Sequence, residues 1–184
     1  MRSFLSLAAA ALLLPGAAEA SSLVIGSGYA RSCFEAADKE RASPGTVELC
    51  DKALAEEALS FEDQVATYVN RGILRARLND WAGATADYDR AIRLDPAEPD
   101  AYLNKAALVL KVKQDWRQAR DLFGAAIERR TRRPELAHYG RGISSEMGGD
   151  YAGALADYQK ASELAPEWDV PKRELTRFTV RKRG

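Results

Sequence analysis

The stretch DWAGATADYDRAIRLDP, residues 80–96, recurs in altered form as DWRQARDLFGAAIERRT at 115–131 and as DYAGALADYQKASELAP at 150–166. The three stretches begin 35 residues apart and agree in five columns. The columns hold an aspartate, an aromatic residue, an alanine, a second aromatic residue and a second alanine: Asp80, Asp115 and Asp150; Trp81, Trp116 and Tyr151; Ala84, Ala119 and Ala154; Tyr88, Phe123 and Tyr158; Ala91, Ala126 and Ala161. Such a period predicts a chain built from copies of one small structural unit.

Each stretch has the features of a helix that begins just after its aspartate. A carboxylate at this position accepts hydrogen bonds from the free amide groups of the first helical turn. The first alanine, the second aromatic residue and the second alanine are spaced by four and three positions, so they share one helical face. Another helical stretch precedes each aspartate, at about 63–78, 98–113 and 134–147, with Gly72, Ala106 and Gly142 at its packing position. Each unit is therefore predicted to be a hairpin of two antiparallel helices.

This pattern resembles the tetratricopeptide repeat, whose units are helix pairs of about 34 residues. The second half of the family signature is matched by Ala84, Tyr88, Ala91 and Pro96. The resemblance implies an all-α fold, a right-handed α-solenoid of antiparallel hairpins. Three repeats are expected within residues 63–166, at about 65–98, 99–133 and 134–166.

The first half of the signature departs from the family. Three basic residues stand where the family usually has an aliphatic one: Arg71, Lys105 and Arg141. The middle unit also gains one residue before Gln114, and it ends in Thr131 rather than in proline. These departures affect the local register of the units.

Two further segments complete the expected array of about four hairpins plus a C-terminal capping helix. Residues 21–62 are expected to form a degenerate first hairpin, with helices at about 29–41 and 46–60. Residues 167–184 are expected to form the capping helix, as far as about residue 182, and a basic tail; Pro171 must then lie in the first turn of this helix or break it.

The N-terminus has the composition of a secretory signal. Arg2 precedes an apolar run from Phe4 to Leu14, and small residues surround a cleavage site after Ala20. The run is too short for a bilayer-spanning helix, which needs about 20 residues. Residues 1–20 are therefore predicted to be a signal peptide, and the remaining chain to be exported to the periplasm or secreted, with no membrane insertion after cleavage.

The two cysteines are predicted to form a disulfide. In the repeat register Cys50 takes the second aromatic column of the first hairpin, and Cys33 takes the small-residue column on the facing helix. Exported proteins meet oxidising conditions, which favours a bond between Cys33 and Cys50. The alternative is a pair of small buried thiols. A catalytic thiol fits least, because the only histidine, His138, belongs to a distant hairpin.

Composition and motifs favour a protein that is not an enzyme. Lysine and arginine total 27 against 27 aspartate and glutamate, so no overall charge attracts nucleic acid. No phosphate-binding loop, zinc motif or nucleophile–base pair is recognised, so no catalytic residue, cofactor or metal is predicted. The abundant carboxylates are expected to lie on the wet face of the solenoid.

The resemblance places the first helix of each unit along a concave groove that binds a protein or peptide. Asn70 and Asn104 share the column in which family members often use asparagine to bind a peptide backbone, and an amide side chain offers both a donor and an acceptor. A solvated or capping role for these asparagines, and ordinary packing for the apolar residues, remain open. A structural subunit that forms a homo-oligomer and an accessory regulator of an envelope enzyme are the alternatives to an adaptor. The predicted groove residues are Val69, Asn70, Ile73, Arg77, Leu103, Asn104, Ala107, Lys111, Tyr139, Ile143 and Met147.

Overall fold

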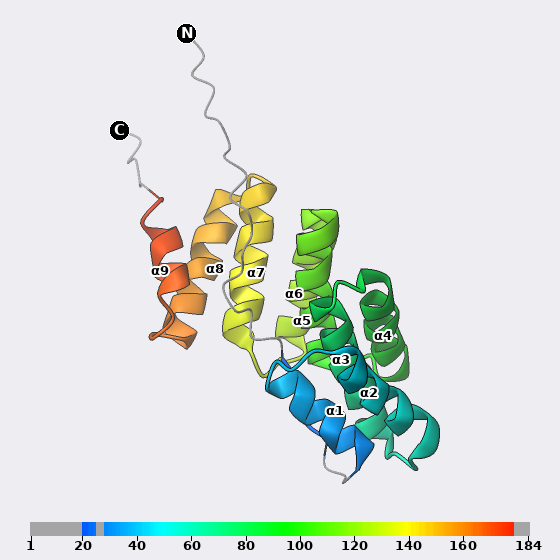
Figure 1. Cartoon of the computed structure of the whole chain (residues 1–184). Helices are drawn as coiled ribbons and strands as arrows, with labels where there is room; N and C mark the ends of the chain where they lie inside the picture. Colours follow the sequence, from blue (N-terminus) through cyan, green and yellow to red (C-terminus); the bar gives the residue numbers. More distant parts are fainter. Residues whose placement is uncertain (1–19, 25–27, 179–184) are drawn as a thin grey trace, which may run out of the picture.

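The computed structural model describes residues 20–24 and 28–178, and residues 28–178 are mainly helical (Figure 1). The predicted signal peptide and the end of the basic tail lie outside the described residues, apart from Ala20. The helices are α1 (Tyr29–Asp38), α2 (Pro44–Glu56), α3 (Phe61–Arg77), α4 (Trp81–Leu94), α5 (Pro99–Leu108), the π-helix η1 (Val109–Lys113), α6 (Trp116–Glu128), α7 (Pro134–Met147), α8 (Tyr151–Leu164) and α9 (Asp169–Leu175).

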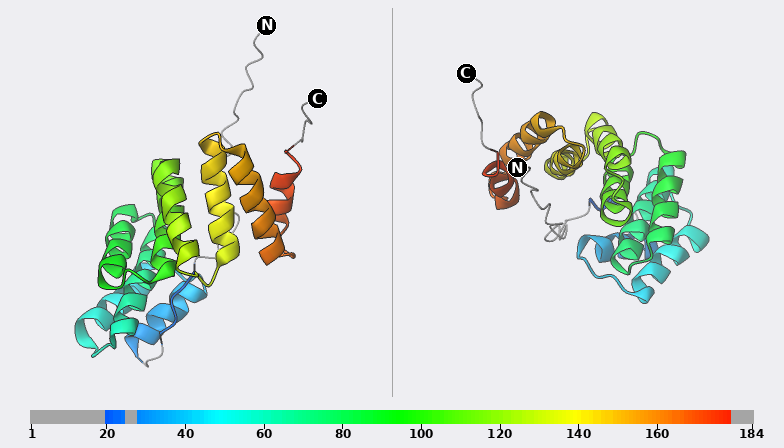
Figure 2. Two further views of the ribbon diagram at one scale, coloured as in Figure 1. Left: turned by 180° about the vertical axis from the view of Figure 1, so that it is seen from behind. Right: turned by 90° about the horizontal axis from the view of Figure 1, so that it is seen from above.

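Successive helices pair into four hairpins, α1 with α2, α3 with α4, α5 with α6 and α7 with α8, and α9 packs on α8. Neighbouring hairpins stack in chain order, and Figure 2 shows the helices following an arc when the molecule is viewed from above. The predicted α-solenoid of helical hairpins is confirmed.

The aspartate column caps the second helix in three hairpins, as predicted. The side chains of Asp80, Asp115 and Asp150 accept hydrogen bonds of 2.9, 3.0 and 2.9 Å from backbone amides in the first turns of α4, α6 and α8. The residue before each aspartate has a positive φ, 64° at Asn79, 52° at Gln114 and 81° at Gly149. Each hairpin thus turns through one left-handed residue followed directly by a capping carboxylate.

The small and aromatic columns meet inside the hairpins. Tyr88 and Tyr158 are each 1% exposed. A β-carbon added to Gly72 would lie 2.5 Å from the ring of Tyr88, and one added to Gly142 would lie 2.8 Å from the ring of Tyr158. These contacts are too short for a larger residue, so glycine permits the close approach of the two helices.

The extra residue of the middle unit is absorbed by a π-helix. The first helix of this unit is α-helical as far as Leu108 and then widens into η1, which ends beside the left-handed Gln114. A single π-turn accommodates one inserted residue within a helix. Phe123 and Ala106 consequently keep their places in the core, where they are 3% and 0% exposed.

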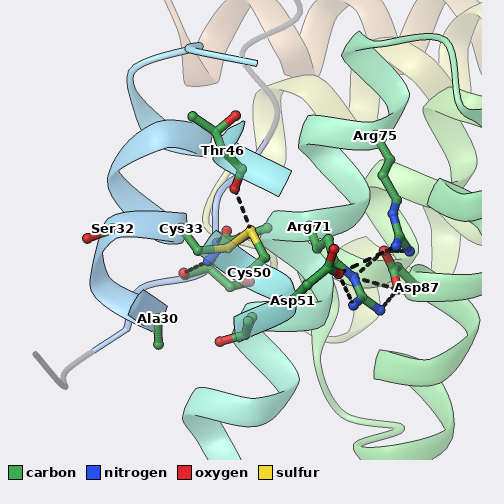
Figure 3. The surroundings of a disulfide bond; sticks show 12 residues. Ala30, Ser32, Cys33, Thr46, Cys50, Asp51, Arg71, Arg75 and Asp87 are labelled. Carbon is green, nitrogen blue, oxygen red and sulfur yellow. Dashed lines mark hydrogen bonds and ion pairs between the residues drawn. A yellow bond between two sulfur atoms is a disulfide. The ribbon is translucent and has the colours of Figure 1, made fainter. Parts of the chain in front are cut away.

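The predicted disulfide between Cys33 and Cys50 is confirmed and joins α1 to α2 (Figure 3). The Cα atoms of the two residues are 5.0 Å apart, and both side chains are fully buried. They pack with Ala36, Ala37 and Val69, so the bond lies in the core that the first hairpin shares with α3.

The expectation that the carboxylates lie on the wet face is wrong for Asp87, Asp100 and Asp157, which are 2%, 1% and 6% exposed. Arg71 donates to Asp87 over 3.0 and 2.6 Å, and Arg75 adds a bond of 2.7 Å (Figure 3). These buried charges are tolerated because guanidinium groups satisfy the carboxylate oxygens.

Asp157 repeats this arrangement in the last hairpin. It accepts hydrogen bonds of 2.9 and 2.8 Å from Arg141 and lies 2.8 Å from Nδ1 of His138. Burial opposes the charge on Asp157, but the bonds from His138 and Arg141 outweigh it and keep the pKa of Asp157 below its usual value. In the middle unit Leu122 takes the place of the aspartate, and Lys105 pairs instead with Asp89 over 2.5 Å. The basic column therefore serves as a set of partners for buried or neighbouring carboxylates.

The last helix is shorter than expected. It begins at Asp169 with Pro171 in its first turn, as predicted, but ends at Leu175 rather than near residue 182. Its buried side is completed by Phe178, whose ring lies 5.9 Å from that of Tyr158.

Candidate peptide-binding groove

Residues 20–24 lie against the first helices of three hairpins, and we call this segment the strap. It runs antiparallel to α1, since Val24 accepts a hydrogen bond from Arg31 near the start of that helix and Ser21 donates to Asp38 at its end. The left view of Figure 2 shows the strap as a dark blue trace beside α1. The surface that Asp38, Asn70, Glu98, Asn104 and Arg132 form around the strap is called the groove below.

Asn70 holds the backbone of the strap at its centre. Its Oδ1 accepts from the amide of Ser22 over 2.9 Å, and its Nδ2 donates to the carbonyl of the same residue over 2.7 Å. One side chain thereby satisfies both polar groups of one extended residue. Asn70 is fully buried, so these bonds are shielded from water.

Two more residues hold the N-terminal half of the strap. Nδ2 of Asn104, in the same repeat column as Asn70, donates to the carbonyl of Ala20 over 3.1 Å. The guanidinium of Arg132, in the loop between α6 and α7, donates to the carbonyl of Ser21 over 2.5 Å. Three successive carbonyl groups of the strap therefore each accept a hydrogen bond, without a contribution from side chains of the strap.

Two acidic residues, the buried Asp100 and the partly buried Glu98, lie beside these contacts. Asp100 accepts a hydrogen bond of 2.7 Å from Thr131 and one of 2.6 Å from Arg132. The second bond orients the arginine toward the strap. Glu98, the N-cap residue of α5, accepts a hydrogen bond of 3.3 Å from the hydroxyl of Ser22 and one of 3.1 Å from the backbone amide of Asp100. Burial and the neighbouring charge of Asp100 raise the pKa of Glu98 above its usual value.

The structure brings only part of the predicted groove residues to the strap. Asn70 and Asn104 donate or accept hydrogen bonds with it, and Leu103 belongs to an apolar cluster that includes Ala20. Val69 and Ile73 lie in the core with the disulfide, which is the packing role that the sequence left open. The solvated alternative for the asparagines is wrong, because Asn70 and Asn104 are 0% and 4% exposed.

Of the other predicted groove residues, Arg77 lines a cavity beside Ala20 and Ser21, and the rest lie farther along the array or at its rim. Tyr139 packs against Tyr158 and Trp168, with ring centroids 5.7 and 4.9 Å away. Arg77 pairs with Glu40 over 3.3 Å, and Lys111 lies 5.1 Å above the ring of Trp81. Three members remain partly or largely exposed: Ala107, Ile143 and Met147.

Asp38, Glu98 and Arg132 were missed as groove residues, and so was Asp100, which orients Arg132. Asp38, Glu98 and Arg132 lie at helix ends or in a loop, where no repeat column marks them. The replacement of the closing proline by Thr131 was the only sequence signal nearby, and it reflects the bond of Thr131 to Asp100.

Residues 20–24 and 28–178 contain no group of three or more histidine, cysteine, aspartate or glutamate side chains arranged to hold a metal ion. Within the same ranges, no helix combines the length and apolar character that a bilayer span requires.

The stacked hairpins define a helical-repeat protein, a class whose solenoids present extended concave surfaces. The tetratricopeptide-repeat profile matches residues 69–112 and 104–167, which together exceed half of the chain. The chain belongs to the tetratricopeptide-repeat family, whose members are typically interaction scaffolds. Among curated proteins, no match is found.

Several solved structures share this fold. A MamA fragment from Desulfovibrio magneticus RS-1 is 23% identical and has a TM-score of 0.63, with 83% of this chain and 84% of that chain covered. The TPR domain of Arabidopsis OM64 is 24% identical and has a TM-score of 0.59, with 64% of this chain and 96% of that chain covered. YrrB, described as a TPR protein with an unusual peptide-binding site, is 25% identical and has a TM-score of 0.62, with 70% of this chain and 63% of that chain covered.

Proposed function

We propose that this chain is an exported adaptor without catalytic activity of its own, which binds an extended segment of a partner protein in the groove around Asn70 and Asn104. The partner's backbone would take the place of the strap. Backbone recognition requires no particular side chain, so affinity comes from the main chain and selectivity from the pockets beside it.

One observation carries this proposal: Asn70 binds both the amide and the carbonyl of Ser22. A helical ligand has few free backbone groups to offer, whereas an extended segment offers both at each residue. Asn104 repeats the donor role one unit further along the array. The groove is thus suited to an extended chain rather than to a helix.

The test is a crosslinking pull-down from envelope fractions with Asn70→Ala plus Asn104→Ala. Each hydrogen bond contributes about 1 kcal/mol, so partner recovery should fall by at least about tenfold. Gln118→Ala plus Gln159→Ala is the matched control, since it removes two exposed amide side chains from α6 and α8. Unchanged recovery with the asparagine variant, folded as judged by circular dichroism, would discard the groove as the binding site.

Export is proposed from the signal-like N-terminus and is supported by the disulfide. A reporter enzyme that is active only in an oxidising compartment, fused after Gly184, should be active. Replacing Leu12 and Leu13 with arginine in the apolar run should abolish this activity, because the signal would lose its apolar character. Activity of a cytoplasm-specific reporter alone would contradict export.

A further inference from the structure

The strap buries alternate side chains. Ala20, Ser22 and Val24 are 4%, 3% and 0% exposed, whereas Leu23 between the last two is 53% exposed. Burial with a period of two is the mark of an extended segment lying on a surface. The groove therefore has distinct sites for alternate side chains of a bound segment, in addition to the residues that bind its backbone.

Each buried position has its own surroundings. Ala20 packs in the apolar cluster of Leu103 and Ala106. The hydroxyl of Ser22 donates to Glu98. Val24 packs with Ala30, Ala53 and Ala66 and with the partly buried Phe34 and Leu59. The three positions accept a methyl group, a small hydroxyl-bearing side chain and a β-branched aliphatic side chain.

The position of Ser21 differs from these. A cavity of about 240 Å³ adjoins Ala20 and Ser21 and is bordered by Asp38, Glu40 and Arg132, with Ala37, Arg77 and Arg133 completing its lining. Charged groups of both signs border this space, and a side chain longer than serine fits there. Selection against large side chains thus applies to the buried positions and not to those between them.

The strap already forms hydrogen bonds with the groove side chains that an incoming partner segment would bind. Both polar groups of Asn70 are engaged by Ser22, and Arg132 is engaged by the carbonyl of Ser21. No second backbone can bind these groups while the strap is in place. Residues 21–24 follow the predicted cleavage site and would remain in the exported chain.

We infer that the strap is an internal competitor, and that the partner enters by displacing residues 21–24 with an extended segment that places a small, a hydroxyl-bearing and a β-branched residue at alternate positions. This inference rests on the proposed function of the groove. It adds the chemistry of the partner segment and the order of events, since the strap must leave before the partner binds.

The probe is an acetylated, fluorescein-labelled peptide with the sequence EASSLVI of residues 19–25, measured by fluorescence anisotropy. The chain from Ser21 to Gly184 should bind it at least about tenfold more weakly than the same chain carrying Ser22→Pro. Proline removes the amide that donates to Asn70 and so loosens the strap. Adding Asn70→Ala to Ser22→Pro should abolish the gain.

Two altered peptides test the register. Ser22→Trp in the peptide should reduce binding by at least about tenfold, because the buried position has no room for an indole. Leu23→Trp should leave binding within about twofold, since that side chain points to solvent. If Ser22→Pro disrupts folding, a chain that begins at Gly28 replaces it.

Equal binding of the peptide by the wild-type and Ser22→Pro chains would show that the strap is not a competitor. The proposed function would still stand if the pull-down with Asn70→Ala plus Asn104→Ala failed to recover the partner. Equal binding of the two tryptophan peptides would overturn the register. Absence of peptide binding by every loosened chain would overturn the inference as a whole, and the pull-down would then decide the function separately.

Discussion

Replacing Cys33 and Cys50 with alanine is expected to lower the melting temperature of the chain from Ser21 to Gly184 by about 6 to 12 °C. A disulfide that closes a loop of this size stabilises by roughly 3 kcal/mol, mainly through the entropy of the unfolded chain. In a domain of this length each kcal/mol corresponds to about 2 to 4 °C. Circular dichroism at 222 nm follows the transition.

Reduction of the wild-type chain is the matched control. Wild type treated with a reductant should melt near the temperature of the alanine variant, and the variant should not respond to the reductant. Hydrogen exchange should then locate the loss of protection in α1 and α2, because a helical array opens in units rather than as a whole. A wild-type melting temperature that is independent of reductant, with both thiols shown to be free, would contradict the role assigned to this bond.

Asp87→Leu is expected to lower the free energy of unfolding by roughly 3 kcal/mol or more. The change removes the two-oxygen partner of Arg71, whose side chain is 15% exposed, and a partner of Arg75, and breaking a buried ion pair from one side costs about this much. Arg71 keeps its contact of 2.6 Å with Asp51, which limits the loss. Urea unfolding monitored by tryptophan fluorescence measures the change.

The double variant Arg71→Leu plus Asp87→Leu should recover more than half of this loss. Apolar replacement of a buried ion pair is often neutral, and the middle unit already has Leu122 in the aspartate column. Asp121→Leu is the control, since Asp121 is an exposed aspartate on α6, and should change stability by less than about 0.5 kcal/mol. A double variant that is less stable than Asp87→Leu would show that the pair is required beyond charge compensation.

The hairpins could be predicted because their determinants recur. The Asp80 column fixes where helices begin, and the Tyr88 and Gly72 columns fix which faces meet. The same register placed Cys33 opposite Cys50. The Arg71–Asp87 pair was also visible in principle, since arginine and aspartate occur 16 residues apart in the first and third repeats and are both replaced in the second.

The strap could not be predicted in the same way. Its carbonyl and amide groups make most of its hydrogen bonds, and every residue type provides these groups. Residues 20–24 belong to no repeat, so no column indicates where they lie. Asn70 makes two hydrogen bonds to the strap, which no repeat column indicates, and this explains why the sequence left a solvated role open.

The position of α9 limits how copies of the chain could join. Pro166 and Pro171 stand where Pro96 and Ala101 stand two units earlier, so α9 lies where the first helix of a further unit would lie. Trp168 and Phe178 cover the rings of Tyr139 and Tyr158 there. Another molecule therefore cannot extend the stack end to end from α8 into a filament unless this helix is first removed.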